Sequence, residues 1–165
     1  MTIFVCGDTL EGILCGVYDA WMSRLGHDNV ALELEDEGHL RMFCQYRQVE
    51  ETKEKADKVI RAVREKAGQE ACEMVFRVSL SREEGKADRI YRFLVYALSG
   101  RGRITDLLQI PAVYEVFRID RNVGNEAHQF IQFSRFSRTR EGILVSTVKP
   151  KNDVVILMAP HFADR

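Results

Sequence analysis

The clearest chemical signal in the sequence is a run of alternating aromatic, arginine and hydroxyl residues at positions 133–140. Alternate residues of a strand share a face, so Phe133 and Arg135 would lie on one side and Phe136 and Arg138 on the other. Aromatic rings stack on nucleobases and guanidinium groups pair with phosphates, which makes such a strand suitable for binding nucleic acid. The alternative is an edge strand that exposed charge protects from aggregation.

A second alternating segment at 143–149 follows a short turn at 140–142, and the two together indicate a β-hairpin. The return strand would add lysines and complete a basic sheet edge. The hairpin residues that we expect to contact nucleic acid are Phe133, Arg135, Phe136, Arg138, Arg140, Lys149 and Lys151.

A long helical pattern precedes the hairpin, from Pro111, which suits the first turn of a helix, to about Phe133. Its polar ridge is rich in hydrogen-bond donors and could follow a phosphate backbone or simply be hydrated: Arg118, Arg121, Asn125, Gln129 and Gln132. Asp120 instead falls on the apolar face. A buried carboxylate is costly unless it is paired, so we expect an arginine from elsewhere, or His128, to pair with it.

Three residues near the C-terminal end could act in general acid–base catalysis, namely Glu126, His128 and His161. Glu126 and His128 lie about 200° apart around a helix, so they cannot bind one metal ion as residues at i and i+4 can. His161 would meet His128 only through the tertiary fold. These residues would serve an alternative function, an enzyme that acts on a nucleobase or sugar.

The sequence contains no nucleotide-binding glycine motif, P-loop, nucleophile elbow or zinc-protease motif. The cysteines, Cys6, Cys15, Cys44 and Cys72, lack the spacing of zinc or iron–sulfur ligands. Free cysteine usually packs as a small apolar residue. We therefore expect no metal and no cofactor.

Length and charge define the class of protein. The chain has 165 residues, of which 45% are hydrophobic, and this predicts one globular domain at 1–165. The longest apolar stretch, Val154–Pro160, is too short to span a membrane, and no positive charge precedes the N-terminal apolar run, so we expect a cytoplasmic protein. Residues 1–57 carry 5 basic and 12 acidic side chains, whereas residues 58–165 carry 19 basic and 13 acidic side chains.

Hydrophobic periodicity predicts the elements that must position these residues. The predicted order is a strand at 3–5, a helix from Asp8 or Thr9 to about Arg24, a strand at 41–51, a helix from Thr52 that Gly68 ends, helices at 69–80, after Ser81 and at 111–133, the hairpin, and a helix at 154–165. The expected fold class is therefore α+β, mostly helical, with helices packed on one side of a small, mostly antiparallel sheet.

Five segments in sequence order carry a family resemblance: residues 7–15, 56–59, 123–128, 133–136 and 160–165. Together they resemble a bacterial family of DNA metabolism or DNA repair proteins. That family is a domain of unknown function that is encoded beside a radical-SAM protein and is joined in some members to a uracil-DNA-glycosylase-like domain. Family members continue past Pro160–Arg165, so we expect either a short member or a chain truncated at its C-terminal end.

The resemblance implies a role connected with DNA, and it adds to what the residues predict. The leading hypothesis is an accessory protein that binds nucleic acid through the basic helix and hairpin and works with a radical-SAM protein or a uracil-DNA-glycosylase-like domain. The enzyme described above is one alternative. A protein-interaction adaptor that does not bind nucleic acid, and docks a basic partner on the acidic residues Glu33–Glu37, is another.

Overall fold

The structure is a computed structural model and describes residues 1–38, 41–100 and 104–163. The strands are β1 (Thr2–Cys6), β2 (Val30–Leu34), β3 (Gln45–Gln48), β4 (Ser137–Arg138) and β5 (Leu144–Val145). The α-helices are α1 (Leu10–Met22), α2 (Lys53–Ala67), α3 (Gln69–Ser79), α4 (Lys86–Ala97), α5 (Pro111–Phe133) and α6 (Val155–Ala163), and short 3₁₀ turns occupy His27–Asn29 and Ile104–Leu107.

The main sheet has three parallel strands in the order β2-β1-β3, with Phe4 opposite Leu32 on one side and Arg47 on the other. The prediction of helices packed on one side of a small, mostly antiparallel sheet is therefore wrong. Helix α1 connects β1 to β2, and a helical crossover of this kind joins parallel strands. The only antiparallel pair in the described residues is β4 with β5, two residues in each strand and separate from the main sheet.

Helices cover the sheet and continue into a helical stack. α1 packs on β1 and β2, and α4 packs on β2, so all five residues of β2 are buried. One apolar cluster runs from Phe4 in the sheet through Val17 of α1 and Leu94 of α4 to Val116 of α5. The sheet and helices α1 to α4 thus form a body on which α5 rests.

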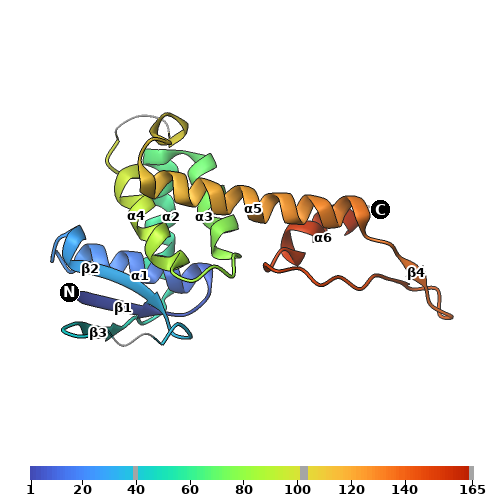
Figure 1. Ribbon diagram of the computed structural model, residues 1–165, viewed down its shortest axis with the longest axis horizontal. Coiled ribbons are helices and arrows are strands. Elements are labelled where there is room, and N and C mark those ends of the chain that lie inside the picture. Colours follow the sequence, from blue (N-terminus) through green and yellow to red (C-terminus); the bar gives the residue numbers. More distant parts are fainter. Residues whose placement is uncertain (39–40, 101–103, 164–165) are drawn as a thin grey trace.

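Helix α5 crosses this body and then projects away from it (Figure 1). Its N-terminal part packs on α3 and α4, whereas α6 packs against its far part. The hairpin of β4 and β5 lies beyond the end of α5 (Figure 1). We call residues 134–163 the arm, because they follow α5, form the hairpin beyond its end and then run back along it to α6.

Several local predictions are confirmed. The side chain of Thr9 accepts a hydrogen bond from the Gly12 amide and caps α1, and Pro111 starts α5. α2 ends before Gly68, whose φ of 89° favours glycine. Some boundaries differ. α4 begins at Lys86 rather than directly after Ser81, and the strand predicted at 41–51 spans only β3. None of the described helices is both long and apolar enough to cross a membrane.

Candidate nucleic-acid interface

A polar groove follows the solvent-exposed side of α5. One part of it, about 300 Å³, and a second part, about 540 Å³, share Asn122 and Asn125, so the two parts are continuous. The groove includes most of the predicted polar ridge and adds residues from the loop before α4 and from the arm. Its lining residues are Arg82, Glu83, Tyr114, Phe117, Arg118, Arg121, Asn122, Asn125, Glu126, Gln129, Lys151 and Asn152.

Arg118 is bound by acidic side chains of the protein itself. Its guanidinium group donates to both carboxylate oxygens of Glu83, at 3.0 and 2.8 Å, and to Glu115 at 3.0 Å. These hydrogen bonds raise the pKa of Arg118, and the bond from Arg118 is the main cause that lowers the pKa of Glu83. Arg118 therefore ties α5 to the loop before α4 and offers little unpaired charge to a ligand.

Arg121 lies in the same groove, and its charge is accessible to a ligand. Its guanidinium carbon lies 5.8 Å from the centre of the Phe117 ring, a cation–π distance that leaves the N–H groups able to donate to other acceptors. The side chain is exposed, and it forms no ion pair with any acid in the described part of the chain. Arg121 is thus the cation of α5 that is available to a phosphate.

Glu126 binds the arm. Its carboxylate accepts hydrogen bonds from the Lys151 amide at 2.5 Å, from the Asn152 amide at 3.1 Å and from the Asn152 side chain at 2.6 Å. These bonds bring Lys151 beside α5 and occupy both carboxylate oxygens. The geometry of Glu126 is that of a structural anchor for residues 151–152.

The other two candidate acid–base residues lie in separate contacts. His128 is exposed, and its Nε2 lies 2.7 Å from the side-chain nitrogen of Gln132. The ring of His161 packs edge-on against Phe162, with 5.1 Å between ring centres. Within residues 1–38, 41–100 and 104–163, no hydrogen bond joins any two of Glu126, His128 and His161, and no group of three His, Cys, Asp or Glu side chains could hold a metal ion.

The hairpin is shorter than predicted, because only Ser137–Arg138 and Leu144–Val145 pair as strands and α5 includes Phe133. Phe133 is therefore a helical residue with 76% of its surface exposed, rather than the start of a strand. Phe136 contacts the ring of Phe162 at 4.9 Å between centres and so connects the hairpin segment to α6. Of the two predicted stacking residues, Phe133 is the more accessible.

The basic residues of the arm are exposed and unpaired. No acid in the described residues forms an ion pair with any of them, in contrast to Arg118. They are Arg135, Arg138, Arg140, Lys149 and Lys151. Together with Arg121 they form the set of available cations on α5 and the arm.

Asp120 confirms the prediction made for its buried position. Arg77 Nε lies 2.5 Å from one carboxylate oxygen of Asp120, and Arg77 Nη2 lies 3.3 Å from the other. The partner is thus an arginine of α3 and not His128. This pair fastens α5 to the body below the polar groove.

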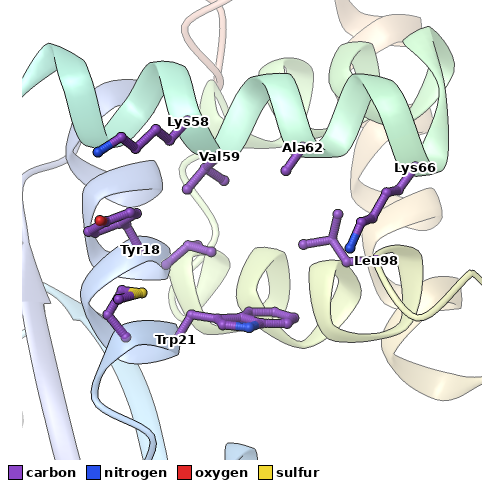
Figure 2. Close-up of a pocket in the computed structure, with 9 residues that line it drawn as sticks. Tyr18, Trp21, Lys58, Val59, Ala62, Lys66 and Leu98 are labelled. Carbon is purple, nitrogen blue, oxygen red and sulfur yellow. The ribbon is translucent and has the colours of Figure 1, made fainter.

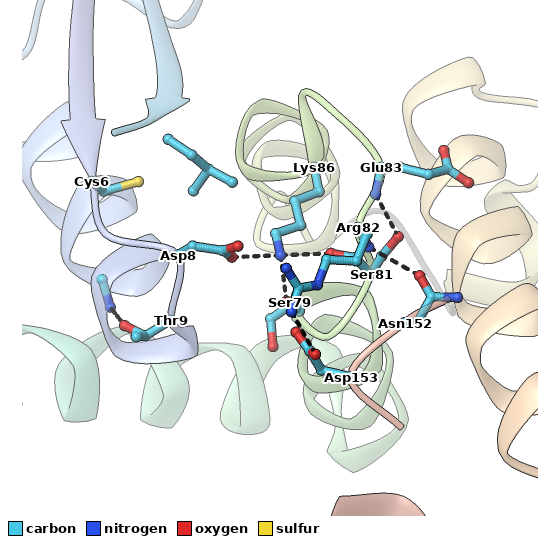
Figure 3. Close-up of polar contacts among 12 residues, drawn as sticks. Cys6, Asp8, Thr9, Ser79, Ser81, Arg82, Glu83, Lys86, Asn152 and Asp153 are labelled. Atoms are coloured by element: carbon cyan, nitrogen blue, oxygen red, sulfur yellow. Dashed lines mark hydrogen bonds and ion pairs between the residues drawn. The ribbon is translucent and has the colours of Figure 1, made fainter. Parts of the chain in front are cut away.

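A buried lysine supports the loop that forms one wall of the groove (Figure 3). Lys86 is 1% exposed, and its ammonium group donates to the carbonyl oxygens of Ser79 and Ser81 at 2.8 and 2.6 Å. It also lies 2.5 Å from a carboxylate oxygen of Asp8, which follows β1 at the carboxyl edge of the sheet. Arg82, which follows Ser81 in this loop, binds the arm through an ion pair with Asp153 at 2.8 Å.

Six groove residues were not predicted from the sequence: Arg82, Glu83, Tyr114, Phe117, Asn122 and Asn152. Asn122 lies four positions after Arg118 and three before Asn125, so helical periodicity could have placed it on the same ridge. Arg82 and Asn152 are 70 positions apart and meet through the fold, where the Arg82 amide donates to the Asn152 side chain at 3.0 Å. No spacing in the sequence indicates that contact.

Comparison with known families matches residues 84–165 to one described as a domain of unknown function, DUF4130. The matched residues include α4, α5 and the arm, and therefore most of the polar groove. No curated protein and no solved structure matches the chain. Asp164 and Arg165, which belong to the C-terminal segment of the resemblance, lie outside the described residues.

Proposed function

We propose that the protein is a nucleic-acid-binding accessory factor of DNA metabolism or repair that acts in the cytoplasm. The observation that carries this proposal is the groove on α5, where Arg121 and Lys151 lie among amide side chains, followed directly by an arm whose cations form no ion pair with any acid that the structure describes. The role in DNA metabolism rests on the resemblance in five sequence segments. A radical-SAM protein or a uracil-DNA-glycosylase-like domain would be its partner.

The two kinds of side chain would do different work. Cations of α5 and the arm would contact phosphates, which supplies affinity without reading sequence. The amides of Asn122, Asn125 and Gln129 can donate to and accept from base edges or the sugar–phosphate backbone. Phe133, at the end of α5, would stack on an unpaired base. No step of catalysis is needed for this role.

The salt dependence of binding tests the proposal, because each phosphate contact releases counterions. If the six available cations all contact phosphates, the logarithm of affinity should fall with the logarithm of salt concentration at a slope of about −5 for duplex DNA and about −4 for single strands. Fluorescence anisotropy with labelled single-stranded and duplex oligonucleotides measures both slopes. A slope near zero, or no binding at low salt, contradicts the proposal.

Charge reversal locates the surface. Arg135→Glu with Arg138→Glu should weaken binding at low salt by at least about tenfold and make the slope shallower by about 2, because two contacts are lost. The matched control is Lys53→Glu with Arg61→Glu, two exposed cations of α2 that form no ion pair within the described residues. Equal losses in both double variants would show that binding follows net charge and not the arm.

A further inference from the structure

An apolar pocket of about 230 Å³ lies between α1, α2 and the end of α4 and shares no lining residue with the polar groove. Figure 2 shows Tyr18 and Trp21 of α1 on one side and Val59 and Ala62 of α2 facing them, with Leu98 closing the end. The remaining lining residues are Val17, Met22, Lys58 and Lys66.

The aromatic wall of this pocket is fixed before any ligand enters. The Trp21 ring packs edge-on against His27, with 4.6 Å between ring centres, and against Tyr91 at 6.4 Å. Tyr91 is fully buried, and its hydroxyl lies 2.8 Å from Nδ1 of His27. A ligand would therefore lose little free energy in ordering Trp21, which favours binding to a formed site.

The charge at the pocket is positive. None of its lining residues is acidic, and two are lysines. Lys58 is bound to Glu54 at 2.6 Å, which offsets its charge. Lys66 forms no ion pair within the part of the chain that the structure describes, and Figure 2 shows its ammonium group directed toward the Leu98 end of the pocket. Lys66 is thus the cation available to a ligand there.

We propose that this pocket binds a small organic anion, with an apolar body between Trp21 and α2 and a carboxylate or sulfonate group beside Lys66. The volume equals the share of about eight water molecules in the liquid, which suits a medium-length alkyl chain or a single ring system. A free phosphate ion would leave the apolar walls unused. A nucleotide would bring polar groups that the valine, leucine and alanine side chains cannot hydrogen-bond.

The fluorescence of Trp21 tests this directly, because it is the single tryptophan of the chain. Octanoate should change the Trp21 emission in a saturable titration of the full chain. Octanol and octylammonium have the same apolar body without the negative charge. Their affinities should be lower than that of octanoate by at least about two- to fivefold. Equal affinity for all three, or no saturable response to octanoate, overturns the proposal.

Variants place the response in the pocket. Ala62→Phe fills the space that faces Trp21 and should weaken octanoate binding by more than about tenfold; Ala62→Leu serves the same purpose if the larger side chain disturbs folding. Lys66→Gln should weaken octanoate binding by about two- to fivefold and leave octanol binding unchanged. The matched control, Arg61→Gln, removes an exposed cation of α2 outside the pocket and should change neither. An unchanged octanoate response in a folded Ala62 variant overturns the proposal.

Discussion

The buried ammonium group of Lys86 should be one of the largest single contributors to the stability of the body. We predict the effect of Lys86→Met, which keeps the length of the side chain and removes its charge and donors. In the wild-type protein the ammonium group has three acceptors, two carbonyl oxygens and the Asp8 carboxylate, at 2.5–2.8 Å. The substitution leaves the carbonyl oxygens of Ser79 and Ser81 without this donor.

The structure sets the expected magnitude. Each buried carbonyl that loses its partner costs about 1–3 kcal/mol. The Asp8 side chain is 35% exposed, so water can solvate its carboxylate and that loss is small. Methionine also removes the cost of burying an ammonium group, which offsets part of the total. We therefore expect the free energy of unfolding to fall by about 3 kcal/mol.

The partner variant separates charge from hydrogen bonding. Asp8→Asn keeps both carbonyl contacts but leaves Lys86 buried without a counter-charge, which costs about 3–5 kcal/mol. In Lys86→Met with Asp8→Asn the unpaired charge is gone, so the double variant should be more stable than the sum of the single effects by about 3 kcal/mol.

Urea unfolding followed by Trp21 emission measures these free energies. The matched control is Arg82→Met, which removes the exposed ion pair with Asp153, with side chains 63% and 54% exposed, and should cost less than about 1 kcal/mol. A loss below about 1 kcal/mol for Lys86→Met, or additive effects in the double variant, would refute the reasoning that this lysine is held by buried acceptors and coupled to Asp8.

Three further changes have defined outcomes. Burial and nearby carboxylates raise the pKa of Cys6 from 9.0 to about 12, so the contribution of Cys6 to stability is fully present below pH 9 and is lost as the pH rises toward 12. Because burial also raises the pKa of Tyr91, Cys6→Ala should make the loss of stability above pH 9 smaller in urea unfolding without removing it. Iodoacetamide and mass spectrometry should show Cys44 reacting first. Gly12→Ala should cost at least about 2 kcal/mol, because its Cβ would lie 2.5 Å from the Glu51 carboxylate and close to a backbone carbonyl, and a Glu51→Ala background should restore only part of that loss. Glu126→Ala should leave the backbone amides at 151–152 without their acceptor, which lowers the unfolding free energy by about 1–3 kcal/mol and speeds tryptic cleavage at this loop; unchanged cleavage would contradict the anchoring role.

Helices were predictable because their signals are local. The apolar period, the Thr9 cap and the proline at position 111 act over a few residues, and α1, α2 and α5 follow them closely. The boundary of α4 was missed because Gly85 adopts a left-handed conformation, with φ of 72°, and starts the helix four residues later than Ser81 suggested.

The sheet was not predictable in the same way. Strand β2 is buried throughout by α1 and α4, so it lacks the alternation that marks a half-exposed strand, and its Glu33 resembles the acidic loop that follows it. Because β2 was not predicted, the β1–α1–β2 crossover that makes the sheet parallel could not be predicted either. Conversely, the alternating run at 133–140 predicted a longer hairpin than the structure has. Its first residue, Phe133, belongs to α5 instead.

The candidate interface was predictable only in part. Helical periodicity placed Arg118, Arg121, Asn125 and Gln129 on one ridge, and all four line the groove. The ion pair of Arg118 with Glu83 joins residues 35 positions apart, and no local pattern indicates it. Which arginines stay available to a ligand therefore depends on tertiary contacts.

The side chain of Asn152 links two parts of the protein that are far apart in the sequence, the loop before α4 and helix α5. Its oxygen accepts a hydrogen bond from the Arg82 amide and its nitrogen donates to Glu126, so this side chain links the loop before α4 to α5. The carboxamide accepts at one end and donates at the other. A carboxylate of the same shape would still accept from the Arg82 amide but would repel the Glu126 carboxylate. The spacing between the loop before α4 and α5 is thus held by the Asn152 carboxamide together with the Arg118–Glu83 ion pair.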